Sequence, residues 1–142
     1  MAMEGLRLRF ATMAEVFRPH DGGLPDILGA WDYWRFPSFP GASDWQLVMS
    51  WEATPTPYSE SGKVIVLVYG PGPDGAEIRL ARMEVMIIMN PSDRPADWPN
   101  TATVALPIRL TFPAPGPVRI EFWQTEDGPK YGEVRLRVVE AK

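Results

Sequence analysis

Apolar and polar residues alternate with a period of two along several segments, which is the pattern of β-strands with one buried and one exposed face. The alternating apolar positions are Leu6, Leu8 and Phe10; Ile108, Leu110 and Phe112; Val118, Ile120 and Phe122; and Val134, Leu136 and Val138. Arginine or glutamate occupies most of the positions between them. No segment shows the 3.6-residue period of an amphipathic helix. The pattern predicts antiparallel sheet with one solvated face.

Clusters of glycine, proline and aspartate separate the apolar segments, and these residue types favour tight turns. The clusters are His20–Gly23, Pro71–Gly75, Pro113–Gly116 and Glu126–Pro129. Short strands punctuated in this way are typical of β-sandwiches and barrels. The sequence therefore predicts a single all-β domain over residues 1–142. The expected architecture is an antiparallel two-sheet β-sandwich, immunoglobulin-like, with about seven to nine strands.

Individual positions refine this fold prediction. Pro107 interrupts a good strand pattern, and because proline cannot donate to a sheet ladder, this strand is expected at an edge or at a bulge. Residues 36–43 and 90–100 are proline-rich and too long for tight turns, so we expect ordered loops there. The residues expected in the core are Leu8, Phe10, Val64, Val66, Val68, Ile108, Leu110, Ile120, Phe122, Leu136 and Val138.

Two runs, residues 64–69 and 85–89, are apolar on both faces and so break the alternating pattern. One face of each would form an exposed apolar patch, which monomers seldom carry. The candidate self-association face is Ile65, Leu67, Tyr69, Ile87 and Met89. Either the loop 90–100 with its Trp98 covers this face, or a second copy does so in a twofold homodimer. The homodimer is favoured because one tryptophan and three prolines are little material to cover two strands.

Aromatic residues are concentrated between Trp31 and Trp51. Alternation places neighbours such as Tyr33 and Trp34 on opposite faces, so the core cannot hold all of them. Aromatic side chains anchor protein interfaces and stack on sugars. The candidate binding surface is Trp31, Tyr33, Trp34, Trp45 and Trp98. Core packing of most of these residues is the competing interpretation.

The charge pattern argues against nucleic acid as a partner. The net charge is −4, with 14 basic and 18 acidic residues, and the arginines are spaced singly along strands instead of forming a phosphate-binding patch. No apolar run is long enough to cross a bilayer, and the start lacks the apolar stretch of a secretory signal. Cysteine is absent, which suits a reducing compartment. We therefore expect a cytoplasmic protein with no membrane partner.

The sequence offers no recognisable catalytic centre, metal site or cofactor site. There is no cysteine, and the one histidine, His20, lies in an expected turn, so neither a nucleophile–base pair nor a zinc site is indicated. Carboxylates that a glycosidase would need are Asp26, Asp32, Asp44 and Glu52, but nothing selects two of them. The loop aspartates Asp74, Asp93, Asp97 and Asp127 lack the spacing of a calcium loop.

Several segments together resemble a family of small, uncharacterised bacterial all-β proteins, a domain of unknown function. The matching segments are Phe10-Ala11, Gly22–Trp31, Gly62 before Val64–Tyr69, Pro73–Gly75, Leu110–Phe112, and Gly116 before Val118–Phe122. The resemblance implies the fold and brings no activity or catalytic residues.

These observations predict a protein that is not an enzyme. The favoured function is a non-catalytic protein-interaction or structural module that binds itself or another protein through an aromatic or strand-edge surface. The alternative is a β-sandwich that binds a carbohydrate or another small ligand, and an enzyme ranks third.

Overall fold

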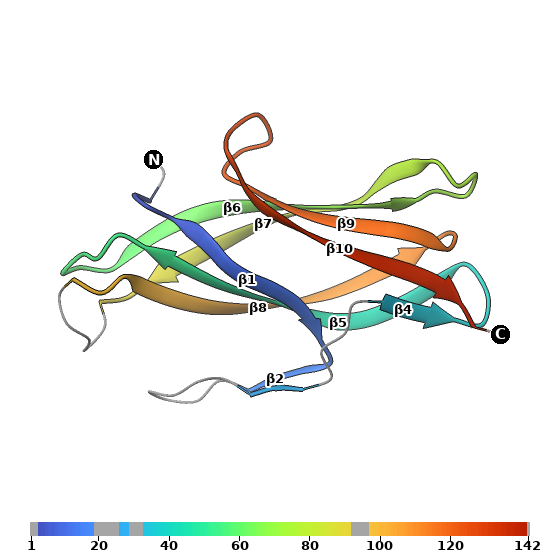
Figure 1. Ribbon diagram of the computed structural model, residues 1–142, viewed down its shortest axis with the longest axis horizontal. Helices are drawn as coiled ribbons and strands as arrows, with labels where there is room; N and C mark the ends of the chain where they lie inside the picture. Colours follow the sequence, from blue (N-terminus) through green and yellow to red (C-terminus); the bar gives the residue numbers. More distant parts are fainter. Residues whose placement is uncertain (1–2, 19–25, 29–32, 92–96, 142) are drawn as a thin grey trace.

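The computed structural model in Figure 1 describes residues 3–18, 26–28, 33–91 and 97–141. These residues form strands and turns and contain no helix, so the all-β prediction is confirmed. The strands of the described residues are β1 (Arg7–Ala14), β2 (Val16–Arg18), β3 (Asp26–Leu28), β4 (Tyr33–Phe36), β5 (Gly41–Ala53), β6 (Glu60–Pro71), β7 (Glu77–Met89), β8 (Asn100–Phe112), β9 (Gly116–Trp123) and β10 (Lys130–Glu140).

Most strands belong to two sheets. One has the order β1-β5-β8, the other has the order β4-β10-β9-β6-β7, and β2 pairs with β3 in a separate hairpin. The pairs are antiparallel except for β4 and β10, which run parallel. The prediction of a purely antiparallel arrangement is wrong at this pair. No hairpin joins β4 to β10, so local chain geometry does not impose an antiparallel direction on them.

The two sheets enclose one hydrophobic core. Trp51 of β5 meets Phe122 of β9 with ring centroids 6.2 Å apart, and it meets Tyr131 of β10 at 5.3 Å. Leu8 packs against this core at its margin. The other expected core residues that are buried are Val64, Val66, Val68, Ile108, Leu110, Ile120, Phe122, Leu136 and Val138.

Phe10 was also expected in the core, and this prediction is wrong because its side chain is 45% exposed. Leu8 pairs with Trp51, but Phe10 pairs with Ser50, so β1 carries one extra residue between these two positions. A β-bulge of this kind shifts the alternation by one. Phe10 therefore points to the solvent face, and Met13 takes the inward position further along the strand.

The predicted turns lie where strands reverse. Gly75 has a φ of +87° and its N–H donates to the Gly72 carbonyl at 2.9 Å, closing the β6–β7 hairpin. The Asp74 carboxylate accepts the Ala76 N–H at 3.0 Å in the same turn.

Pro107 lies in β8, which ends its sheet, so the edge-strand prediction is confirmed. Of the expected loop 36–43, Phe36 and residues 41–43 are strand.

Candidate functional site

The aromatic residues predicted to form a binding surface separate into two groups. Trp34 and Trp45 are buried with ring centroids 5.2 Å apart, and Phe112 lies 4.9 Å from Trp34, so these tryptophans pack in the core. Tyr33 and Trp98 are exposed. Tyr33 begins β4, whereas Trp98 precedes β8, and these places lie toward opposite ends of the long axis in Figure 1. They do not form one surface, and Trp31 lies outside the described residues.

The residues predicted to form a self-association face do not share one face. Gly62 pairs with Ile87 and Glu60 pairs with Met89, so both apolar residues point inward with Val64 and are fully buried. Placing Ile87 and Met89 on the outer face is therefore wrong. The outward positions of this part of β7 are Met86 and Ile88. The sequence carries a signal for this, because residues 84, 86 and 88 of a strand share a face and the charged Glu84 marks that face as the solvent-facing one.

Ile65, Leu67 and Tyr69 do lie on the outer face of the five-stranded sheet, but Ile65 and Leu67 are buried there. On β9 they are paired with Trp123, Glu121 and Arg119 respectively. The Arg119 guanidinium lies over the Tyr69 ring, 4.6 Å from its centroid. Long charged side chains cover apolar surface with their methylene groups. Side chains of the same sheet thus cover this face, and neither the loop 90–100 nor a second copy is required.

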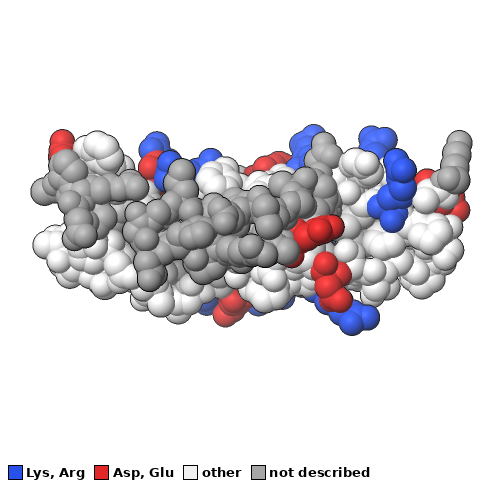
Figure 2. All heavy atoms as spheres, turned by 90° about the horizontal axis from the view of Figure 1, so that it is seen from below, with Lys and Arg blue, Asp and Glu red and all other residues white. Residues whose placement is uncertain are grey.

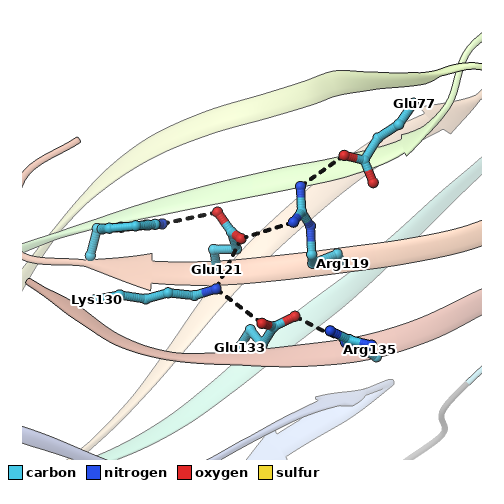
Figure 3. A network of polar contacts seen from close by, with 7 residues as sticks. Glu77, Arg119, Glu121, Lys130, Glu133 and Arg135 are labelled. Atoms are coloured by element: carbon cyan, nitrogen blue, oxygen red, sulfur yellow. Dashed lines mark hydrogen bonds and ion pairs between the residues drawn. The ribbon is translucent and has the colours of Figure 1, made fainter. Parts of the chain in front are cut away.

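Glu121 is the centre of a charged network on this outer face, shown in Figure 3. Its side chain is 7% exposed and accepts the Trp123 Nε1–H and a Lys130 Nζ–H, both at 3.0 Å. An Arg119 nitrogen lies 3.3 Å from the same carboxylate. A buried carboxylate is tolerable only when paired in this way.

The network continues outward from Glu121 in two directions. Arg119 donates to Glu77 at 2.8 Å, and Lys130 donates to Glu133 at 3.0 Å. Hydrogen bonds from Lys130 and then from Arg135 lower the pKa of Glu133 below its ordinary value. The bonds to Glu133 and Glu121 in turn raise the pKa of Lys130. Each charge in the network faces an opposite charge, so the network suits holding β9 and β10 together better than proton transfer.

A second charged group lies over β7 and the β9–β10 turn. Arg82 is ion-paired with Glu126, and its other nitrogen lies 3.1 Å from Glu84. Arg79 lies 3.7 Å from Glu126. The hydrogen bond with Glu126 raises the pKa of Arg82, and the same bond lowers the pKa of Glu126.

Exposed apolar residues are concentrated on β7. Met86 and Ile88 are 57% and 58% exposed, and Ile78 at the other end of the strand is 40% exposed. Tyr58, two residues before β6, and Trp98, two residues before β8, are exposed as well. The start of β6 meets the end of β7 here, because Glu60 pairs with Met89 and the Ser59 hydroxyl donates to Asn90 Oδ1 at 2.8 Å. The start of β8 is close by, because Asn100 Nδ2 donates to Thr56 Oγ1 at 3.2 Å.

β7 is also an edge strand, and it differs from the other three edges of the two large sheets. β8 contains Pro107, β1 has the bulge between Leu8 and Phe10, and β4 is only four residues long. Proline, bulges and short length are devices that keep edge strands from pairing with other chains. β7 is 13 residues long and has no proline. It does carry a bulge of its own, opposite Val68/Tyr69, but this bulge lies near one end and leaves Ala81–Met89 in regular register with β6.

A groove of about 490 Å³ lies at one end of the molecule, between the residues that precede β1 and those that follow β5. It is lined by Gly5, Leu6, Arg7, Glu52, Ala53, Thr54, Pro55 and Pro99. The Glu52 carboxylate is ion-paired with Arg7 and lies 3.9 Å from Arg9. The volume of the groove is in the range of small-molecule sites.

The other carboxylates singled out in the sequence do not converge. Asp44 lies 3.9 Å from Arg109 on the exposed face of the three-stranded sheet, and Glu52 is in the groove. The side chain of Asp26 and all of His20, Asp32 and Asp93 lie outside the described residues. Among the residues with described side chains, His and acidic groups form no cluster of three that would hold a metal ion.

Two properties of the described surface bear on partners. In the view of Figure 2, basic and acidic side chains both occur along the upper and lower rims, and residues without charge make up most of the other described surface. The described residues include no helix long and apolar enough to span a bilayer.

Comparison with known proteins identifies no family, since no protein-family model and no curated protein matches the sequence. Among solved structures, the chain is similar to the Pseudomonas fluorescens alkylpurine DNA glycosylase AlkC bound to DNA containing an abasic site analog. The TM-score is 0.49 at 9% identity, over 97% of this chain and 31% of that one. It is also similar to a beta-glucosidase from Listeria innocua, with a TM-score of 0.48 at 8% identity over 78% of this chain and 15% of that one. Similarities this low carry no argument about function.

Proposed function

We propose that this chain is a non-catalytic protein-interaction module and that β7 is its binding edge. The observation that carries the proposal is the pair Met86 and Ile88, both more than half exposed on an edge strand with no proline. A partner strand added beside β7 would satisfy its free backbone groups and cover these side chains.

The charged groups of the outer face support a non-catalytic role. Glu121, Lys130, Glu133 and Arg119 are engaged with one another, and a general acid or base needs a group free to exchange a proton with substrate. The proposal also extends to a cytoplasmic location and to an immunoglobulin-like arrangement of the two sheets around their shared core.

Photo-crosslinking tests the binding edge. A photoreactive amino acid placed at position 86 should give an adduct with a partner in cells, whereas one at Arg137, exposed on β10, should give none. Mass spectrometry of the adduct then identifies the partner as this chain or another protein. Absence of any adduct at position 86, or equal yields at both positions, would contradict the proposal.

The groove beside β1 and β5 supports a second candidate function, binding of a carbohydrate or similar small ligand. It combines a carboxylate, one guanidinium group and Thr54 with two prolines, and the exposed Trp98 is the residue before Pro99. Polar groups that fix orientation beside apolar walls are typical of ligand sites. A saccharide bound there should change tryptophan fluorescence in the wild type and much less in Trp98→Phe. Unchanged fluorescence and a blank calorimetric titration would exclude this candidate for the sugars tested.

A further inference from the structure

We propose that the occupant of the β7 edge is a second copy of this chain, paired antiparallel about a twofold axis at Met83. This inference rests on the proposed binding edge and adds the identity of the partner and its register. About this axis the regular stretch Ala81–Val85 of each copy pairs with the same stretch of the other, and it bears Arg82 and Glu84 as outward residues.

Sheet geometry limits the registers to a few. The five-stranded sheets of the two copies can form one continuous sheet only if the core-facing residues of both copies lie on the same side. Because successive side chains alternate, the residue numbers of each facing pair must then add to an even number. The twofold axis therefore passes between the two copies of one β7 residue, and the central choices for that residue are Met83, Glu84 and Val85.

The charges on β7 distinguish these three registers. An axis at Met83 places Arg82 of each copy opposite Glu84 of the other, giving two pairs of opposite charge. An axis at Glu84 places two carboxylates opposite each other, which is destabilising. An axis at Val85 places Glu84 opposite the apolar Met86. Only the Met83 register is complementary to itself, which is what a twofold interface requires.

The exposed apolar residues of β7 lie outside this charged centre. With Met83 at the axis, residues 86–88 of one copy lie beside residues 78–80 of the other, where β7 has its bulge opposite Val68/Tyr69. Leu80 packs against the core there. The register is therefore specified by the two charge pairs within Ala81–Val85 and not by apolar contacts.

Charge exchange at the centre tests the inference in the intact protein. Light scattering after size exclusion should give the wild type a mass twice the chain mass of 15.9 kDa. Arg82→Glu alone and Glu84→Arg alone should reduce this to the mass of one chain, because each places like charges across the axis. The double variant Arg82→Glu/Glu84→Arg should recover the dimer. The double variant does not restore the contact of Arg82 with Glu126, but it does restore opposite charges at positions 82 and 84 within one chain. Rescue of the dimer is therefore read together with the cysteine pairing, which reports only contacts between copies.

Cysteine pairing gives the register directly, because the chain has no cysteine of its own. An oxidised mixture of Arg82→Cys and Glu84→Cys should yield the mixed disulfide in excess over either homodimer. A dominant Glu84→Cys homodimer would overturn the Met83 register. A wild type that stays monomeric at high concentration would overturn self-association. In that case an adduct of position 86 with a different protein would leave the binding edge standing, and no adduct would remove both proposals. Arg137→Glu, on β10, is the matched control and should stay dimeric.

Discussion

Whether a single side chain in this molecule is buried or exposed depends on which face of its strand it occupies. Phe122 and Phe10 both occupy apolar positions of alternating segments, yet Phe122 is fully buried and Phe10 is 45% exposed. The sequence alone does not distinguish the buried phenylalanine from the exposed one, because the bulge in β1 is visible only in its pairing with β5. The same holds for Glu121, whose burial depends on Trp123, Lys130 and Arg119 meeting it across two strands.

The contrast between the two phenylalanines predicts unequal mutational effects. Phe122→Ala should lower the free energy of unfolding by about 3–5 kcal/mol, because it leaves a cavity in the core. Phe10→Ala should lower it by less than about 1 kcal/mol, because much of that ring is already in water. Urea denaturation measures both. Equal losses would mean that the bulge in β1 is misplaced.

Glu133 gives a pH-dependent prediction. Its pKa in the folded protein lies below the ordinary 4.5, so its ionised form stabilises the fold above about pH 4.5. That contribution is lost as the pH falls through the folded-state pKa. The stability difference between wild type and Glu133→Gln should therefore be full near neutral pH and shrink below about pH 4.5. Urea midpoints of the two proteins measured across this range test it, and a difference that stays constant with pH would contradict it.

At the scale of elements, the β6–β7 hairpin and one edge strand follow from local chemistry, and the β7 edge does not. The turn at Pro71–Gly75 forms as expected from its glycines and aspartate. Pro107 correctly identifies β8 as an edge strand. That β7 is also an edge depends on the order of strands in the sheet, which no local pattern specifies.

Gly75 provides a test at this scale. Its φ of +87° is costly for residues with a side chain, and a Cβ built there meets nothing within 4 Å. Gly75→Ala should therefore destabilise the protein by about 1 kcal/mol through backbone strain alone. Gly75→Asn should cost less, because asparagine adopts positive φ more readily. Thermal or urea unfolding compares the two, and a larger loss for asparagine would contradict the backbone explanation.

At the scale of the whole molecule, the outer face of the five-stranded sheet has two parts with different roles. Leu67 is buried beneath charged side chains of its own sheet, whereas Ile88 projects into solvent from the edge. Leu67→Glu should lower the free energy of unfolding by about 2–4 kcal/mol, because it buries a carboxylate beside Glu121. Ile88→Glu should change the stability of the single chain by less than about 0.5 kcal/mol. Denaturation of each variant at low protein concentration decides this, and a stable Leu67→Glu protein would show that the network does not seal the face.

The amino-acid sequence by itself determines the class of structure, part of the core and several of the turns, because alternation and turn chemistry act between residues close in the chain. It also indicates that Ile65, Leu67 and Tyr69 point outward, because alternation places them on the same face of the strand as the charged Lys63. It does not identify the buried residues of β5, such as Leu47, Met49 and Trp51. Only the tertiary structure decides that β4 runs parallel to β10, that Phe10 is exposed, and that β9 and β10 supply the cover for Ile65 and Leu67. These features depend on which distant strands become neighbours. Strand order is set by the packing of the whole core, so the place of β7 at an edge, and with it the candidate interface, is a property of the folded molecule.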